Sequence, residues 1–133
     1  MKIENKIYLD GGIVESLPFE KAINDGHEKT VLLLTRTLEY RKKIQPALWA
    51  FRLLYFRYPR IYKELKIRHH NYNNLVKKAI KLEKEGKLFI KRPENELDIG
   101  RFEKDINKLN NIYDYGYEYI QKRYAELIEY LEN

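Results

Sequence analysis

The short stretch YLDGGIVESLP, residues 8–18, contains the residue best placed for chemistry. Asp10 is followed directly by Gly11 and Gly12, and Pro18 closes the stretch. An aspartate at the carboxyl end of a strand, on a glycine turn, stands where α/β sheets present catalytic groups. The local pattern favours a carboxylate that hydrogen-bonds the amides of its own turn, with a catalytic carboxylate as the alternative.

Other residue types narrow the possible chemistry further. The chain has no cysteine, which excludes thiolate catalysis and cysteine-bound zinc. Its one serine, Ser16, is not part of a G-x-S-x-G nucleophile elbow. The three histidines lack the spacing of a metal site, so we expect neither a metal nor a cofactor. No complete active site is visible in the sequence.

An aromatic segment that contains arginines is the second candidate for function. It could lie at a lipid interface, with its aromatic rings at headgroup depth and its arginines on phosphates. Burial between a sheet and neighbouring helices is the favoured interpretation, because apolar residues occupy all sides of the expected helix. The candidate lipid-facing residues are Trp49, Phe51, Arg52, Tyr55, Phe56 and Arg57.

Charge is unevenly distributed along the chain, whose net charge is +6. Residues 36–92 carry 17 basic and 4 acidic side chains, whereas residues 1–35 and 93–133 are both net negative. Such a block could meet phosphate groups on lipids or nucleic acid, or form solvated helix faces. A nucleic-acid interface is not favoured, because the tyrosines are scattered rather than gathered on one platform. With no apolar run long enough to span a bilayer, we expect a soluble, cytoplasmic protein, with peripheral membrane contact as an option.

The elements expected to position these residues form an α/β fold. Residues 6–10 are predicted to form a strand, Pro18 to open a helix that ends near Gly26, and residues 29–35 to form a strand buried on both faces. Together they would make a βαβ unit with a parallel sheet.

The rest of the chain is predicted to be helical apart from a short strand near residues 88–92. One helix is expected from Pro46, at its first turn, until Pro59, and a second from about Arg60 towards Gly86. One long amphipathic helix with Asp105 as its N-cap would end the chain. On its apolar face, Gly116 would let another backbone approach closely.

The segment YLDGGIVESLPFEKAI resembles the second catalytic motif of bacterial patatin-like phospholipases. That motif has an Asp-Gly-Gly turn, then a proline and an alanine in the next helix, here Asp10, Gly11, Gly12, Pro18 and Ala22. The likeness continues through KTVLLLTR, KEGKLFIKRP and GRFEKDINKLNNIYDYGYE, and so covers nearly the whole chain. It implies the C-terminal part of a patatin-like α/β fold, with a few mostly parallel strands. Residues 1–35 would end the catalytic domain, and residues 36–133 would form a helical C-terminal region.

The resemblance also implies an activity. The family hydrolyses acyl esters of lipids with a Ser-Asp dyad, in which Asp10 would be the base, supported by Gly11, Gly12 and Pro18. The serine elbow precedes the aspartate in this family, and only nine residues precede Asp10. We therefore expect a catalytically incomplete C-terminal portion of a phospholipase or esterase that self-associates as a homodimer. The alternative is a basic, aromatic helical module that binds anionic membrane surfaces or a protein partner.

Overall fold

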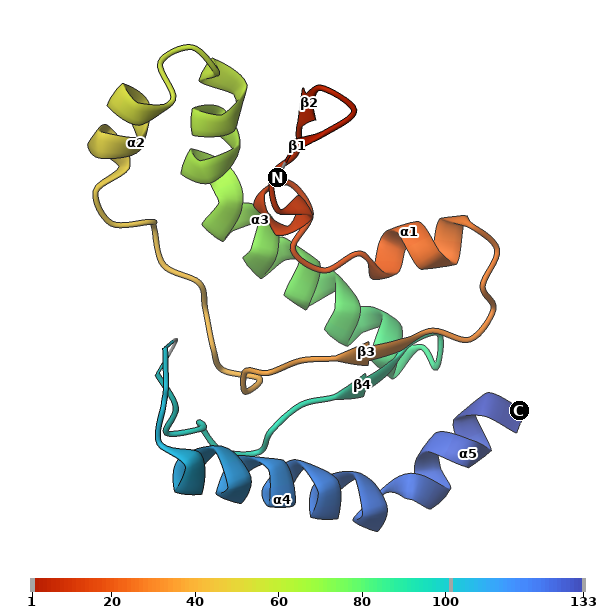
Figure 1. Cartoon of the computed structure of the whole chain (residues 1–133). Helices are drawn as coiled ribbons and strands as arrows, with labels where there is room; N and C mark the ends of the chain where they lie inside the picture. Colours follow the sequence, from red (N-terminus) through yellow and green to blue (C-terminus); the bar gives the residue numbers. More distant parts are fainter. Residues whose placement is uncertain (1, 101, 133) are drawn as a thin grey trace.

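The computed structural model describes residues 2–100 and 102–132 and has a mostly helical α/β fold, as predicted (Figure 1). Its elements, in chain order, are β1 (Lys2–Ile3), β2 (Lys6–Ile7), the 3-10 turn η1 (Gly11–Ile13), α1 (Phe19–Asn24), β3 (Val31–Leu33), α2 (Leu48–Leu54), α3 (Pro59–Lys84), β4 (Phe89–Lys91), α4 (Ile106–Lys122) and α5 (Tyr124–Glu132). Among these described helices, none is long and apolar enough to cross a membrane.

The central sheet consists of β3 and β4, which pair in parallel with Val31 opposite Phe89. The chain between them passes through α2 and α3. Figure 1 shows the strand pair lying between α3 and the segment α4–α5. The short strand expected near residues 88–92 is therefore confirmed as β4, and its partner is the apolar run that was expected to form a parallel strand.

The predicted βαβ unit over residues 6–35 is wrong. Strand β2 ends at Ile7 and pairs antiparallel with β1, in a hairpin of its own. Glu4 and Asn5, the two turn residues, have φ of 44° and 63°. Positive φ at both positions is typical of tight two-residue hairpins. Strand β2 therefore pairs with its neighbour β1 instead of joining the parallel sheet with β3.

The hydrophobic core lies where α1, the C-terminal half of α3 and the strand pair meet. The buried apolar side chains of this cluster are Leu17, Phe19, Leu32, Val76, Ala79, Leu88 and Ile90. Within β3, Leu32 is 8% exposed while Leu33 is 68% exposed. The prediction of a strand buried on both faces is therefore wrong, because only the face that carries Leu32 packs into the core.

Pro18 and Pro46 were expected to open helices, and Pro18 lies immediately before α1, which begins at Phe19. The helix expected from about Arg60 is α3, whose first residue is Pro59, so Pro59 begins a helix where an interruption was expected. Pro46 lies two residues before α2, which begins at Leu48 after Ala47 in the left-handed conformation, with φ of 56°. The expected helix start at Pro46 is thus wrong by two residues, because the chain reverses direction at Ala47.

The C-terminal segment is two helices rather than the single long helix predicted. Asp105 caps α4 as expected, since its carboxylate accepts the backbone N–H groups of Asn107 and Lys108. Arg123 leaves the helical conformation, with φ of −113°, and this break lets α5 take its own direction. In the described part of the chain, no atom beyond the neighbouring turns of α4 lies within 4 Å of the position that a Cβ would take on Gly116, so the predicted close approach of another backbone there is wrong.

Candidate functional site

The Asp-Gly-Gly turn is an exposed 3-10 turn that begins directly after Asp10. Asp10 Oδ1 accepts the backbone N–H of Gly12 at 2.8 Å, so the carboxylate caps its own turn. This is the self-bonded arrangement that the local pattern favoured. The Asp10 side chain nevertheless remains at the surface, where a second group can reach it.

The two glycines of this turn have different steric surroundings. A Cβ on Gly12 would lie 3.2 Å from Asp10 Oδ1 and 3.6 Å from a terminal nitrogen of Arg68. A Cβ on Gly11 would meet no atom within 4 Å. Neither glycine has a positive φ. Gly12 therefore lets the carboxylate fold closely over the turn, whereas Gly11 is not required on steric grounds.

Arg68 on α3 fixes the position of the turn. Its Nε donates to the carbonyl oxygen of Gly12 at 2.8 Å, and the hydroxyl of Ser16 donates to the same oxygen at 2.9 Å. Pro18 lies immediately before α1 and its side chain is exposed. Sequence reasoning missed Arg68, because the contact joins residues 56 positions apart.

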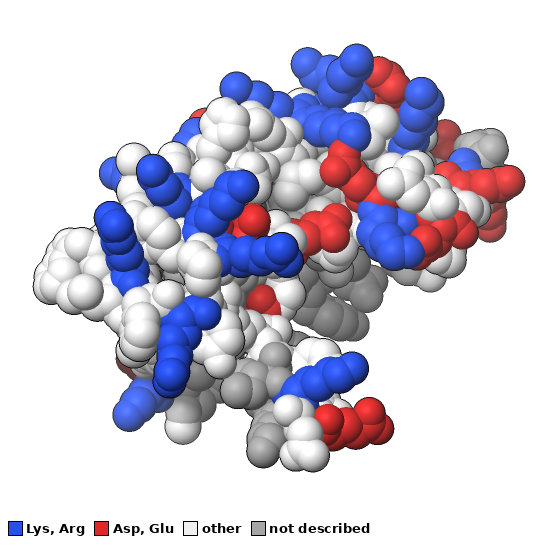
Figure 2. Space-filling view, turned by 90° about the horizontal axis from the view of Figure 1, so that it is seen from above, with Lys and Arg blue, Asp and Glu red and all other residues white. Residues whose placement is uncertain are grey.

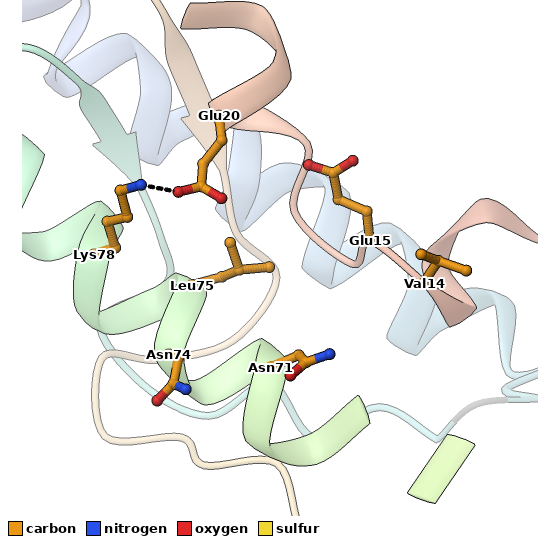
Figure 3. A pocket seen from close by; sticks show the side chains of 7 residues that line it. All are labelled: Val14, Glu15, Glu20, Asn71, Asn74, Leu75 and Lys78. Carbon is orange, nitrogen blue, oxygen red and sulfur yellow. Dashed lines mark hydrogen bonds and ion pairs between the residues drawn. The ribbon is translucent and has the colours of Figure 1, made fainter. Parts of the chain in front are cut away.

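A hollow of about 450 Å³ lies beside this turn, between the η1–α1 segment and α3 (Figure 3). Lys78 forms an ion pair with Glu20 across it. Figure 3 shows Glu15 on the chain segment that faces the helix. The lining residues are Val14, Glu15, Glu20, Asn71, Asn74, Leu75 and Lys78. Asp10 is not among them, so the hollow and the candidate catalytic carboxylate are neighbours rather than one site.

A second depression, of about 490 Å³, is here called the basic pocket. It is lined by Thr35, Arg36, Tyr40, Lys42, Gln45, Arg68, Tyr72, Ile99 and Gly100. Its chemical character is cationic and aromatic. Burial, followed by the neighbouring Tyr40, raises the pKa of the Tyr72 hydroxyl above its ordinary value. Arg68 belongs both to this pocket and to the Asp-Gly-Gly turn.

Helix α2 and the residues just after it leave several large apolar side chains in solvent, which corrects the prediction that they are buried. Trp49 is 71% and Phe56 is 73% exposed, and Leu53 and Leu54 are similarly open. Phe51 and Tyr55 are half-buried and stack on each other with ring centroids 6.3 Å apart. Among the described helices and strands, only α3 makes substantial contact with α2. The rest of α2 therefore stays open to solvent.

Three arginines lie within α2 or shortly after it in the sequence. Arg52, Arg57 and Arg60 are all exposed, and the guanidinium of Arg57 lies 5.8 Å from the ring centroid of Phe56. Figure 2 shows Lys and Arg among uncharged side chains at the left of the view, on the side of α2, while most carboxylates gather at the right. We call Trp49, Leu53, Leu54, Phe56 and these three arginines the α2 surface.

Comparison with known proteins gives one match. Residues 58–132 match the family described as "Domain of unknown function (DUF6363)". No curated protein and no solved structure matches the chain. The matched range covers α3, β4, α4 and α5, including Arg68, whereas the Asp-Gly-Gly turn and α2 precede it.

Proposed function

The chain belongs to the DUF6363 family, and we propose that it is part of a lipid acyl hydrolase to which it contributes Asp10 as the general base. The observation that carries this proposal is the surface carboxylate of Asp10, held by the N–H of Gly12 on a turn that α3 anchors. The resemblance of residues 8–23 to the second patatin motif points to the same residue.

The geometry supports direct proton transfer without a histidine. In a Ser-Asp dyad the carboxylate must approach the serine hydroxyl to about 2.6–3.2 Å, so bulk beside the turn would hinder it. Gly12 removes that bulk on the side where Asp10 Oδ1 lies. The hydroxyl of Ser16 donates to the carbonyl of Gly12, so the proposal assigns the nucleophile to a serine outside these 133 residues.

The proposal can be tested on the native protein recovered from cells with an antibody against α4. A fluorophosphonate probe should label a serine in the recovered material, which should also hydrolyse a short-chain nitrophenyl ester. Asp10→Asn keeps the hydrogen bond to Gly12 but removes the base. We expect the variant to lower the hydrolysis rate about 10²- to 10⁴-fold, the usual contribution of general base catalysis.

Asp25→Asn is the matched control for this experiment. Asp25 is also an exposed aspartate at the end of a short helix, where it pairs with Lys21. The Asp25→Asn variant should leave both fluorophosphonate labelling and ester hydrolysis unchanged. Equal activity of the Asp10→Asn protein and the unmodified protein, or recovered material with no reactive serine, would overturn the proposal.

A second candidate function is binding to anionic membrane surfaces through the α2 surface. The exposure of Trp49 and Phe56 next to three arginines favours it, because interfacial helices combine aromatic side chains with cations that meet lipid phosphates. This function is compatible with the first, since a lipid hydrolase must reach its substrate at a surface.

Vesicle sedimentation tests this second function. Each arginine near an anionic surface contributes about 1 kcal/mol, so replacing Arg52, Arg57 and Arg60 by glutamine should weaken binding to phosphatidylglycerol vesicles about 100-fold. The control replaces Lys77, Lys81 and Lys84, exposed lysines of the C-terminal half of α3. If both triple variants lost the same amount of vesicle binding, net charge alone would explain the effect and a specific role for α2 would be refuted.

A further inference from the structure

The basic pocket concentrates positive charge without a carboxylate in its lining. Arg36 and Lys42 come from the irregular segment between β3 and α2, and Arg68 comes from α3. No acidic side chain is among the described lining residues. The volume of about 490 Å³ falls within the roughly 300–1,000 Å³ that small-molecule sites occupy.

Aromatic rings hold two of these cations in place. The Arg36 guanidinium lies 5.2 Å from the ring centroid of Tyr40, and Lys42 Nζ lies 4.9 Å from that of Tyr72. The two tyrosine rings meet edge to face, with their centroids 6.0 Å apart. Cation–π contacts attract the charges without neutralising them, so they orient these two cations at the pocket wall.

Hydrogen bonds fix the backbone on which Lys42 stands. The N–H of Lys42 donates to Asn73 Oδ1 at 2.9 Å, and Asn73 Nδ2 donates to the carbonyl of Lys42 at 3.1 Å. Arg68 is oriented in turn by its Nε bond to the carbonyl oxygen of Gly12. The site is therefore arranged before a ligand arrives, which lowers the entropy cost of binding.

We propose that the basic pocket binds the phosphate group of a phosphate ester. A phosphate offers several oxygens and up to two negative charges, which suits three cations better than a single carboxylate does. Arginine forks match phosphate geometry, and the protonated hydroxyl of Tyr72 can donate a further hydrogen bond. The phosphate ester can be a lipid headgroup or a free small molecule. The site stands on its own lining and does not depend on the role proposed for Asp10.

Isothermal titration of the full chain with glycerol 3-phosphate tests the proposal. We expect saturable one-to-one binding that weakens at least about tenfold when Arg36 and Lys42 are both replaced by glutamine, since bonds to charged groups contribute about 1.5–3 kcal/mol each. The control replaces Lys77 and Lys84, which lie on α3 outside the pocket. The absence of saturable binding, or equal weakening by the two double variants, would overturn the site.

Two further measurements complete the test. Chemical-shift changes on adding glycerol 3-phosphate to the unmodified chain should concentrate in residues 35–45 and around Arg68. Changes confined to other regions would contradict the proposal even if a variant misfolds.

Short-chain phosphatidic acid below its micellar concentration separates the two ligand sources. Tighter binding than that of glycerol 3-phosphate identifies a lipid headgroup, and equal or weaker binding identifies a free phosphate ester. The Asp10→Asn variant should bind both ligands normally, so this outcome is separable from the fate of the proposed hydrolase activity.

Discussion

The two halves of helix α3 lie in contrasting surroundings. The C-terminal half places Val76 and Ala79 in the core, where they pack with Leu88 of the strand segment. The N-terminal half buries Leu65 but contacts α2, whose Trp49, Leu53 and Leu54 are mostly exposed. The same helix is thus a scaffold at one end and the base of exposed surfaces at the other.

This contrast separates stability from candidate function. Arg68 lies on the N-terminal side of the core contacts, where it lines the basic pocket and anchors the Asp-Gly-Gly turn. Tyr72, at the middle of α3, lines the basic pocket and also packs against the core. Substitutions in the C-terminal half should therefore act on folding, and substitutions in the N-terminal half and α2 should act on binding. The four predictions below test that division.

The largest effect is expected from Leu88→Ala. Leu88 is 2% exposed at the centre of the core, so truncation loses apolar burial and leaves a cavity. We expect the free energy of unfolding, measured by urea denaturation, to fall by about 2–5 kcal/mol. A loss below about 1 kcal/mol would mean that the scaffold end is not the main source of stability.

The next effect concerns two aspartates that cap different elements. Asp105→Ala should cost about 1 kcal/mol, because Asp105 satisfies two N–H groups at the start of a 17-residue helix. Asp10→Asn should cost less than about 0.5 kcal/mol, because the amide oxygen keeps the bond to Gly12. Thermal unfolding of both variants provides the measurement, and a reversed order would place the Asp-Gly-Gly turn within the scaffold.

A smaller, pH-dependent effect is expected at Lys91, a buried lysine beside Glu126. Burial, and then the nearby Arg123 guanidinium, lower the pKa of the Lys91 ammonium in the folded state. Between this lowered pKa and the ordinary value the unfolded chain binds more protons, so the stability of the unmodified protein should rise with pH. In the Lys91→Met variant, the free energy of unfolding should no longer rise with pH in the range just below the ordinary lysine pKa. The Lys77→Met variant should retain the rise in the same urea titrations.

The smallest effect on stability is expected on the α2 surface. Replacing Trp49 and Phe56 together by alanine removes two large side chains that are mostly exposed, so the free energy of unfolding should change by no more than about 0.5 kcal/mol. The same double variant should bind anionic vesicles more weakly. A stability loss comparable to that of Leu88→Ala would show that α2 belongs to the core after all.

Elements with local signals could be predicted from the sequence. The helix expected from about Arg60 towards Gly86 is α3, Gly86 takes a positive φ just after it, and Asp105 caps α4. Strand β4 also lies within its predicted range. In each case the residue determines the backbone conformation of its immediate neighbours, so the local sequence is enough to predict the element.

The features that could not be predicted depend on distant contacts. The apolar residues of α2 indicate burial, but burial requires a partner element, and α3 covers only one side of the helix. The basic pocket requires residues 35–45 to fold back onto α3, and nothing in the local sequence specifies that path. Arg36 and Tyr40, like Arg68 and Tyr72, are four residues apart, yet this spacing alone does not indicate that the two pairs meet.

Tyr130 on α5 has a consequence for the order in which the chain assembles. Its hydroxyl oxygen lies 3.1 Å from the backbone nitrogen of Thr30 and 3.3 Å from the carbonyl oxygen of Lys87, so one phenol joins the beginnings of both strand segments. Once β3 and β4 have paired, docking of α5 through the contact with Lys87 closes a further loop of 43 residues, at an entropy cost of about 3 kcal/mol. We expect β3 and β4 to pair first and α5 to dock last, so that in native-state hydrogen exchange the amides of α5 open well before those of the strands.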